Sequence, residues 1–296
     1  MRTMAAALLL VSACAGPAQS TGPRDAPADA GAGAEAGAPA RVPPGYREAA
    51  PEGERIDLPL AELFVPRGFE IPPDGRVPLF VHFQGGVPVA ERNFVRFERP
   101  GVLIASRLEG RSGAFSEPYR DPAAFVGLLA AGERALAERA GRAVVFAPIR
   151  ITFFSAGYGA VRELLKDESL FRRIDALVSA DSIYADVVPG TRRPMPDQMK
   201  DFLRFARLAA RGEKTFVLVH SDIETPYAST KETADALLEG LGIRRREAGK
   251  WTERGVPIAS EAHAGRFHLF EIGEGDARAH LDSLYGIPEW VRLYVD

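Results

Sequence analysis

The sequence predicts an α/β protein with a mostly parallel central sheet and helices on both faces of that sheet. Short apolar runs rich in β-branched residues recur along the chain, and runs with a helical period lie between them. Continuously apolar strands are typical of a parallel sheet that is covered on both faces. The 296 residues, 46% of them hydrophobic, suffice for one large globular domain.

The strands are predicted from the apolar runs. Between Arg55 and Phe69, short apolar pieces broken by Pro and Gly indicate strands at a sheet edge. The later runs are continuous and bounded by turn residues, as buried strands are. They are Pro78 to Phe83, Gly101 to Ser106, Ala143 to Phe154, Ile174 to Ala180, Thr215 to His220 and Arg266 to Ile272.

The helices are predicted from caps and from periodicity. Asp121 fits an N-cap with Pro122 in the first helical position, and Gly141 closes that helix. Ser229 begins the string S-T-K-E, a capping box that opens a helix reaching about Leu241. The other predicted helices are Tyr158 to Lys166, Asp197 to Arg211 and Asp276 to Leu284.

Charge and cysteine content exclude several classes of function. The net charge is −3 and no basic cluster is present, which argues against a nucleic-acid partner. The single cysteine, Cys14, excludes an internal disulfide and argues against a structural zinc site. We therefore expect no metal site.

The N-terminus has the features of an export signal. An apolar run from Ala5 to Val11 is too short to span a bilayer but suits the core of a signal peptide. It ends in V-S-A-C at Cys14, which resembles the lipobox of bacterial lipoproteins. The resemblance implies a signal peptide over residues 1–14, a lipid on Cys14 as membrane anchor, and a place in the cell envelope. With Ala15 next, Gram-negative sorting rules imply the outer membrane or its periplasmic face. The alternative is an ordinary secretory signal with a chance cysteine.

A composition change separates this segment from the folded part. From Ala15 to Pro44 the chain contains no Leu, Ile, Phe, Trp, Tyr or Met. Such a stretch buries too little apolar surface to offset its ordering entropy. We predict a disordered, Ala/Gly/Pro-rich tether over residues 15–45 and a folded domain over residues 46–296.

A serine lies where a predicted strand meets a predicted helix, in the string F-F-S-A-G-Y-G. Glycine two residues beyond Ser155 permits a sharp turn that lifts the hydroxyl above the sheet edge. The N–H of Ala156 would then face a developing oxyanion. A serine nucleophile needs a histidine base and a carboxylate. Asp181 follows the next strand and His280 follows the last, which gives the chain order Ser, Asp, His.

Three strings carry a family resemblance over roughly Arg55 to the end of the sequence. They are F-S-A-G-Y-G-A-V-R-E from Phe154, D-S-I-Y from Asp181 and H-S-D-I-E-T-P-Y-A-S-T from His220. They resemble α/β-hydrolase-fold proteins, in particular bacterial lipoprotein members. The resemblance implies a serine hydrolase with Ser155 as nucleophile, Asp181 as acid and His280 as base. The resemblance says little about the substrate. Acyl-enzyme chemistry at these residues predicts an ester or a small amide and needs no cofactor.

The same fold takes a second oxyanion N–H from the loop after an earlier strand, here Gln84 and Gly85. One residue departs from the family pattern: Phe153 stands where a small residue is usual, so its ring must point away from the helix or widen the turn. This departure favours the alternative function, a catalytically inactive hydrolase-fold lipoprotein that serves as a binding or scaffold module. For Ser155 alone, the alternative role is a helix N-cap.

Other polar residues have competing interpretations. Asp222 is the alternative acid, and Tyr158 and Tyr184 are candidates to line a pocket, although loop tyrosines also simply pack. His82 is interpreted as a satisfied core histidine and His220 as a structural hydrogen-bonding group. His263 and His268, five residues apart, would face opposite sides if they lay on one strand, and could not share a metal without a bend between them. The loop Ser182 to Pro196 is the only candidate lid, and its short, polar sequence predicts an open site.

Overall fold

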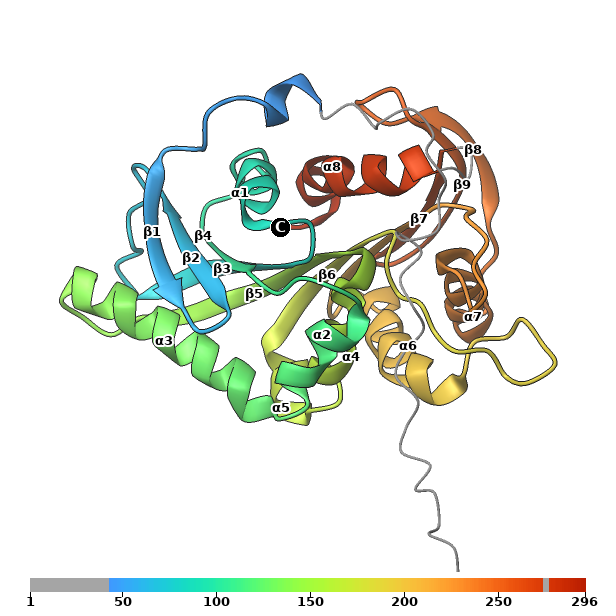
Figure 1. Ribbon diagram of the computed structural model, residues 1–296, viewed down its shortest axis with the longest axis horizontal. Helices are drawn as coiled ribbons and strands as arrows, with labels where there is room; N and C mark the ends of the chain where they lie inside the picture. Colours follow the sequence, from blue (N-terminus) through green and yellow to red (C-terminus); the bar gives the residue numbers. More distant parts are fainter. Residues whose placement is uncertain (1–42, 274–276) are drawn as a thin grey trace, which may run out of the picture.

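The computed structural model describes residues 43–273 and 277–296 (Figure 1). The predicted signal peptide, Cys14 and nearly all of the predicted tether lie outside the described residues. The first described element is a short 3-10 helix, Pro44–Tyr46. Tyr46 is buried, and its hydroxyl donates to Asn93. Within the described residues, no helix is both long and apolar enough to cross a membrane.

A ten-stranded sheet forms the centre of the fold, in the order β1-β2-β4-β3-β5-β6-β7-β10-β9-β8. The strands from β4 through β10 in this order pair in parallel, and both ends of the sheet pair antiparallel. This confirms the predicted fold class. The strands are β1 Gly53–Leu58, β2 Ala61–Pro66, β3 Arg76–Phe83, β4 Val102–Ser106, β5 Val145–Phe154, β6 Ile174–Ala180, β7 Thr215–His220, β8 Arg246–Trp251, β9 Pro257–Ala264 and β10 Phe267–Ile272.

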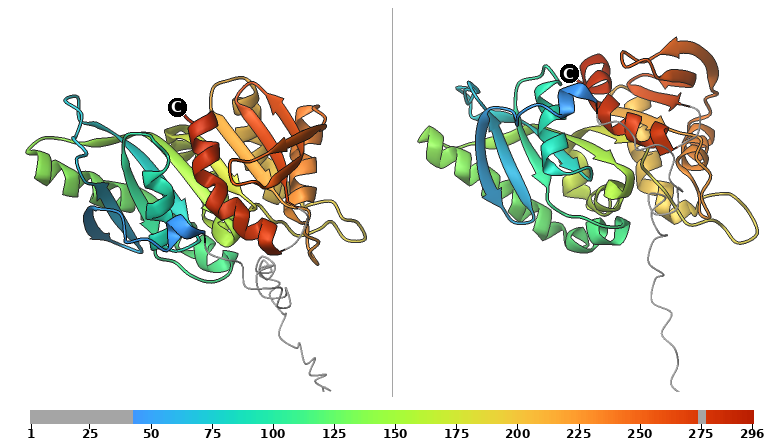
Figure 2. Two further views of the ribbon diagram at one scale, coloured as in Figure 1. Left: turned by 90° about the horizontal axis from the view of Figure 1, so that it is seen from above. Right: turned by 45° about the horizontal axis from the view of Figure 1, so that its top comes forward.

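Helices cover both faces of the sheet (Figure 1). On one face lie α1 and α8, and on the other lie α2 to α7, so that the sheet separates two apolar layers. From above, α8 is seen to lie across the strands (Figure 2). The helices are α1 Val87–Val95, α2 Ser112–Ser116, α3 Pro122–Ala140, α4 Tyr158–Leu164, α5 Glu168–Arg173, α6 Pro196–Ala210, α7 Thr230–Leu241 and α8 Ala277–Tyr294.

The predicted caps are confirmed. The Asp121 side chain accepts from the N–H of Ala123, and Gly141 ends α3 in the left-handed conformation with φ 64°. Ser229 and Glu232 form the reciprocal capping box at the start of α7. These local interactions explain why α3 and α7 begin where the sequence predicts.

The last helix and a hairpin differ from the prediction. The predicted helix ends at Leu284, but α8 continues to Tyr294 with Pro288 inside it. It continues because residues 286–291 are buried in succession and Trp290 stacks on Phe270 of β10. Strands β8 and β9 were not predicted, since β8 is almost wholly exposed and carries no apolar run.

The chain turns between His263 and His268, so the condition of a single strand does not apply. They do not share a strand: Gly265 lies in a turn between β9 and β10, and the two histidines pair across the hairpin. Their Nδ1 atoms lie 3.0 Å apart. A turn between two strands returns the chain to the same face, so a spacing of five residues no longer separates them.

Candidate active site

The serine lies in a tight turn at the end of β5. Ser155 has φ 46°, a left-handed conformation that non-glycine residues rarely adopt. A Cβ on Gly157 would lie 2.6 Å from the carbonyl oxygen of Phe83, and one on Gly159 would lie 2.3 Å from that of Ser112. Only glycine fits at either position. The turn therefore brings α4 directly against β3 and α2.

Phe153 does not prevent this turn. Its ring is fully buried in the apolar layer that also contains α4. Across the sheet it pairs with Phe83 on β3 and with Ser179 on β6. The ring therefore does not point away from the helix, and the turn at Ser155 keeps its positive φ with the ring in that layer.

Ser155, His280 and Asp181 lie in hydrogen-bonding contact. The Nε2 atom of His280 is 3.1 Å from Ser155 Oγ, and its Nδ1 atom is 2.7 Å from Asp181 Oδ2. Because a carboxylate only accepts, the imidazole proton resides on Nδ1, and Nε2 is left to accept from the serine hydroxyl. The three residues come from the end of β5, the first turn of α8 and the end of β6.

Asp181 is fully buried and held by several donors. Besides His280, it accepts from the N–H and hydroxyl of Ser221, each at 2.8 Å, and from the hydroxyl of Thr230 at 2.6 Å. Burial by itself would raise the pKa of Asp181. The hydrogen bonds and the charge interaction with His280 outweigh it and hold the pKa at about 2. The carboxylate is therefore ionised at neutral pH.

His280 is fixed by packing as well as by hydrogen bonding. Its ring lies 4.4 Å from the ring of Phe154, and the hydroxyl of Ser283 donates to its backbone carbonyl. The side chain is 14% exposed, whereas Ser155 as a whole residue is 4% exposed. The imidazole thus lies between the protein interior and solvent.

The expected oxyanion groups gather at the same edge of the sheet. Ala156 follows the serine in the turn, and the Phe83 carbonyl places the Gln84–Gly86 loop beside it. Gln84, Gly85 and Gly86 all have positive φ, at 69°, 107° and 82°. A Cβ on Gly85 would lie 2.9 Å from Leu284 of α8, so this loop also passes close to the helix that carries His280.

The remaining candidates lie elsewhere. Asp222, the alternative acid, is half exposed and pairs with Lys231 at 2.6 Å. Tyr158 and Tyr184 were expected to line a pocket. Both are instead buried, and their rings pack together, with Tyr227 continuing the cluster. Arg162 stacks on Tyr158 and donates to the Tyr184 carbonyl, which anchors both inside the core.

The candidate lid has a buried first part and an exposed tip. Residues 182–185 are buried, and the loop is tied down by bridges from Ala185 to Ala228 and from Val187 to Pro194. Residues 189–193 and Pro196 are exposed. The first part of this loop, directly after Asp181, is therefore held in place by burial and by these bridges.

Two histidines near the site are buried. Burial lowers the pKa of His82 to about 4, and its Nδ1 contacts Thr152 Oγ1 at 2.7 Å. By strict geometry its Nε2 has no hydrogen-bond partner among the described residues, although the ring also interacts with the backbone of Gln84. The prediction of a core histidine is confirmed for its burial. His220 has partners at both nitrogens, Ser221 and Arg245.

Sequence reasoning missed Ser221 and Thr230 as donors to Asp181. Ser221 directly follows β7, so the rule that polar residues after parallel strands converge could have found it. Thr230 belongs both to the capping box and to the string that begins at His220, and neither pattern indicates a contact with Asp181. Across the described part of the chain, no cluster of three or more His, Cys, Asp or Glu side chains could hold a metal ion.

The strand order, the tight turn after β5 and the Ser–His–Asp contacts define an α/β-hydrolase-like fold. No protein-family model and no curated protein sequence matches the chain.

Solved structures similar to the chain include three esterases. They are a feruloyl esterase module from Clostridium thermocellum (9% identity, 86% of this chain and 94% of that chain, TM-score 0.48), an arylesterase (12%, 84% and 87%, 0.47) and a thermostable esterase from Pseudomonas putida (12%, 82% and 80%, 0.43).

Proposed function

We propose that the protein is a serine hydrolase that cleaves an ester or a small amide through an acyl-enzyme intermediate. The observation that carries this proposal is the unbroken series of contacts from Ser155 Oγ through His280 to Asp181. Such a series makes a serine hydroxyl nucleophilic, because the imidazole accepts its proton as the new bond forms.

The proposed reaction has two halves. Ser155 Oγ attacks the substrate carbonyl while His280 Nε2 takes the hydroxyl proton, and the tetrahedral oxyanion accepts from N–H groups of Ala156 and the Gln84–Gly86 loop. His280 then returns the proton to the departing alcohol or amine. Water, deprotonated by His280, releases the acid and regenerates the serine. Asp181 stays ionised and stabilises the imidazolium in both halves.

A fluorophosphonate probe tests this proposal, since it forms a covalent bond only with an activated serine. We expect labelling of the wild type, none of Ser155→Ala, and loss of p-nitrophenyl acetate hydrolysis in the same variant. Ser116→Ala is the matched control, because that hydroxyl only caps a local carbonyl on α2. Equal labelling of wild type and Ser155→Ala, or none of either, would contradict the proposal. It would favour the inactive binding module.

We further propose that the protein is anchored in the cell envelope by a lipid on Cys14. The support is the apolar run that ends in V-S-A-C and the absence of any other cysteine in the sequence. Cys14→Ser should move the protein from the membrane to the soluble fraction and abolish incorporation of labelled fatty acid. Unchanged membrane association in that variant would refute the anchor.

A further inference from the structure

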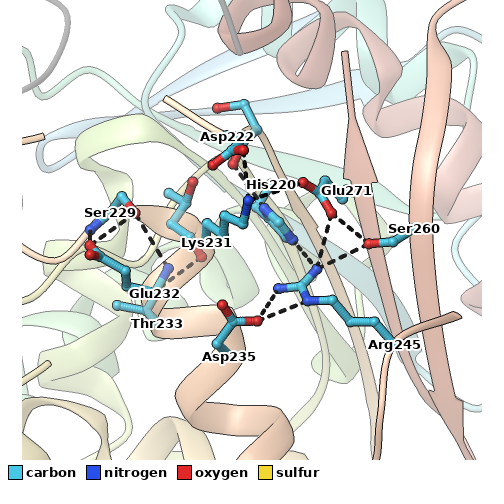
Figure 3. Close-up of polar contacts among 12 residues, drawn as sticks. His220, Asp222, Ser229, Lys231, Glu232, Thr233, Asp235, Arg245, Ser260 and Glu271 are labelled. Carbon is cyan, nitrogen blue, oxygen red and sulfur yellow. Dashed lines mark hydrogen bonds and ion pairs between the residues drawn. The ribbon is translucent and has the colours of Figure 1, made fainter. Parts of the chain in front are cut away.

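We propose that His220 and Arg245 are positioning residues for Asp181, acting through Ser221. The inference rests on the proposed function, because Asp181 is there the group that orients the base. It assigns a role to a polar network behind the site, centred on His220 at the end of β7 and drawn in Figure 3.

The first step is the pair of hydrogen bonds from Ser221 to the Asp181 carboxylate. The N–H of Ser221 donates to Asp181 Oδ1 and its hydroxyl donates to Oδ2, both at 2.8 Å. One residue therefore holds both carboxylate oxygens. Any rotation or shift of Ser221 moves the carboxylate, and with it the oxygen that His280 contacts.

The second step is the hydrogen bond from His220 to Ser221. The Nδ1 atom of His220 lies 2.8 Å from the Ser221 carbonyl oxygen, and its Nε2 atom lies 2.6 Å from Arg245 Nη1. A guanidinium only donates, so Nε2 must be the unprotonated nitrogen. The proton then resides on Nδ1 and is donated to Ser221. Arg245 thus sets the tautomer of His220 that this hydrogen bond needs.

The third step is the fixation of Arg245. Its guanidinium pairs with Asp235 of α7 at 2.7 Å and with Glu271 of β10 at 3.7 Å, and it contacts the hydroxyl of Ser260 on β9 (Figure 3). The side chains of Arg245 and Glu271 are only 18% and 15% exposed, so solvent screens this pair weakly, whereas Asp235 is half exposed. Arg245 directly precedes β8, and the β8–β9 hairpin thereby helps to support the site.

Burial and the adjacent Arg245 charge lower the pKa of His220 to about 4. The ring is therefore neutral at the pH of an assay, with one donor and one acceptor nitrogen. Without Arg245, only the Ser221 carbonyl favours the proton on Nδ1, and the tautomer with the proton on Nε2 is no longer opposed by a donor at that nitrogen. An unprotonated Nδ1 would then face the Ser221 carbonyl, and two acceptors 2.8 Å apart repel each other.

Steady-state kinetics of paired variants test the inference. Arg245→Met should lower kcat for p-nitrophenyl acetate by about 10- to 100-fold with little change in KM, because the substrate is not touched. Arg245→Lys keeps a donor and should retain most of the activity. His220→Asn preserves a donor near the Nδ1 position, so its kcat should be higher than that of His220→Leu. The control is Arg246→Met, which removes the neighbouring, largely exposed arginine and its ion pair with Glu261.

Thermal unfolding of each variant separates positioning from stability. The inference is supported if Arg245→Met and His220→Leu lose kcat while Arg245→Lys and His220→Asn keep it, at matched melting temperatures. Wild-type kcat in both, or equal loss in His220→Asn and His220→Leu, overturns it.

A second readout does not depend on turnover. Proton NMR reports the His280 Nδ1–H that donates to Asp181, and nitrogen shifts report the tautomer of His220. We expect Arg245→Met, and not Arg246→Met, to change both signals. Unchanged signals refute the inference even if the wild type proves inactive. If the wild type is inactive and unlabelled but Arg245→Met still changes both signals, only the proposed hydrolase function is refuted.

Discussion

His280 Nδ1 lies 2.7 Å from Asp181 Oδ2, although 99 residues separate them in the chain. The contact joins the first turn of α8 to the end of β6. Asp181 is in turn fixed by Ser221 and Thr230, from the end of β7 and the start of α7. The orientation of the imidazole therefore depends on how α8 packs across the sheet.

Replacing Thr230 by Val should weaken this arrangement without changing its shape. The variant loses the hydroxyl that donates to Asp181 Oδ1 at 2.6 Å, a hydrogen bond to a buried charge. Such bonds contribute about 1.5–3 kcal/mol, so we expect kcat to fall at least about tenfold. Thr225→Val is the control, because that hydroxyl donates only to the Tyr227 carbonyl. Equal kcat in Thr230→Val and wild type would show that this donor is dispensable.

Adding a methyl group at Gly157 should destabilise the turn. The new Cβ would overlap the Phe83 carbonyl oxygen at 2.6 Å. Overpacking of this kind costs about 1–3 kcal/mol, which a urea unfolding curve resolves. Gly127→Ala is the matched control: it lies inside α3 with nothing within 4 Å of the new methyl, and should leave stability equal or higher. A normal unfolding midpoint for Gly157→Ala would mean that α4 lies farther from β3.

Restoring a small residue at Phe153 should not improve the site. The ring is fully buried, and removing a buried aromatic ring costs about 3–5 kcal/mol. We expect Phe153→Gly to be less stable and, per folded molecule, no faster than wild type in ester hydrolysis. Phe153→Leu should lie between them in stability. A faster and equally stable Phe153→Gly would show that the ring obstructs the turn.

Stability should fall in mild acid. Burial lowers the pKa of His82, His220 and His268 to about 4, compared with an ordinary value of 6.5. These rings are neutral in the folded state but take up protons when unfolded, so protons favour unfolding. Urea midpoints should be constant above pH 6.5 and decrease as the pH falls from 6.5 to 4. Asp181 has a pKa of about 2, below its ordinary value of 3.8, so it adds a loss of stability only below pH 3.8.

The histidine origin of this pH dependence can be checked with His268→Gln, which removes a half-buried ring near the sheet edge. The decrease in midpoint between pH 6.5 and 4 should become smaller in this variant. A midpoint that does not change from pH 7 to pH 4 in the wild type would contradict the neutral state of the three rings.

The parallel strands and the three contacting side chains were predictable because each depends on local signals. Apolar runs mark β3, β5, β6 and β7, and in a parallel sheet the residues after such strands meet at one edge. Ser155 and Asp181 both follow strands of this kind. His280 followed from the required order of base and acid, although the helix that carries it proved longer.

The remaining features depend on contacts between distant segments. Strand β8 is exposed on nearly every residue, so its sequence has no apolar alternation to detect. The pairing of His263 with His268 required the turn at Gly265, and a spacing of five cannot distinguish a hairpin from a strand. Ser221 and Thr230 lie in the string that begins at His220, but the string does not reveal that both donate to Asp181 or that Arg245 fixes His220, because these are tertiary contacts.

His280 is synthesised after the other two residues of the site. Residues 277–294 form the last described helix, whereas the serine and the aspartate lie more than 90 residues earlier in order of synthesis. A growing chain can complete the strands that bear Ser155 and Asp181 while the imidazole has not yet been made. Under the proposed function, unfinished chains are incapable of acyl transfer. Hydrolytic activity begins only when α8 docks.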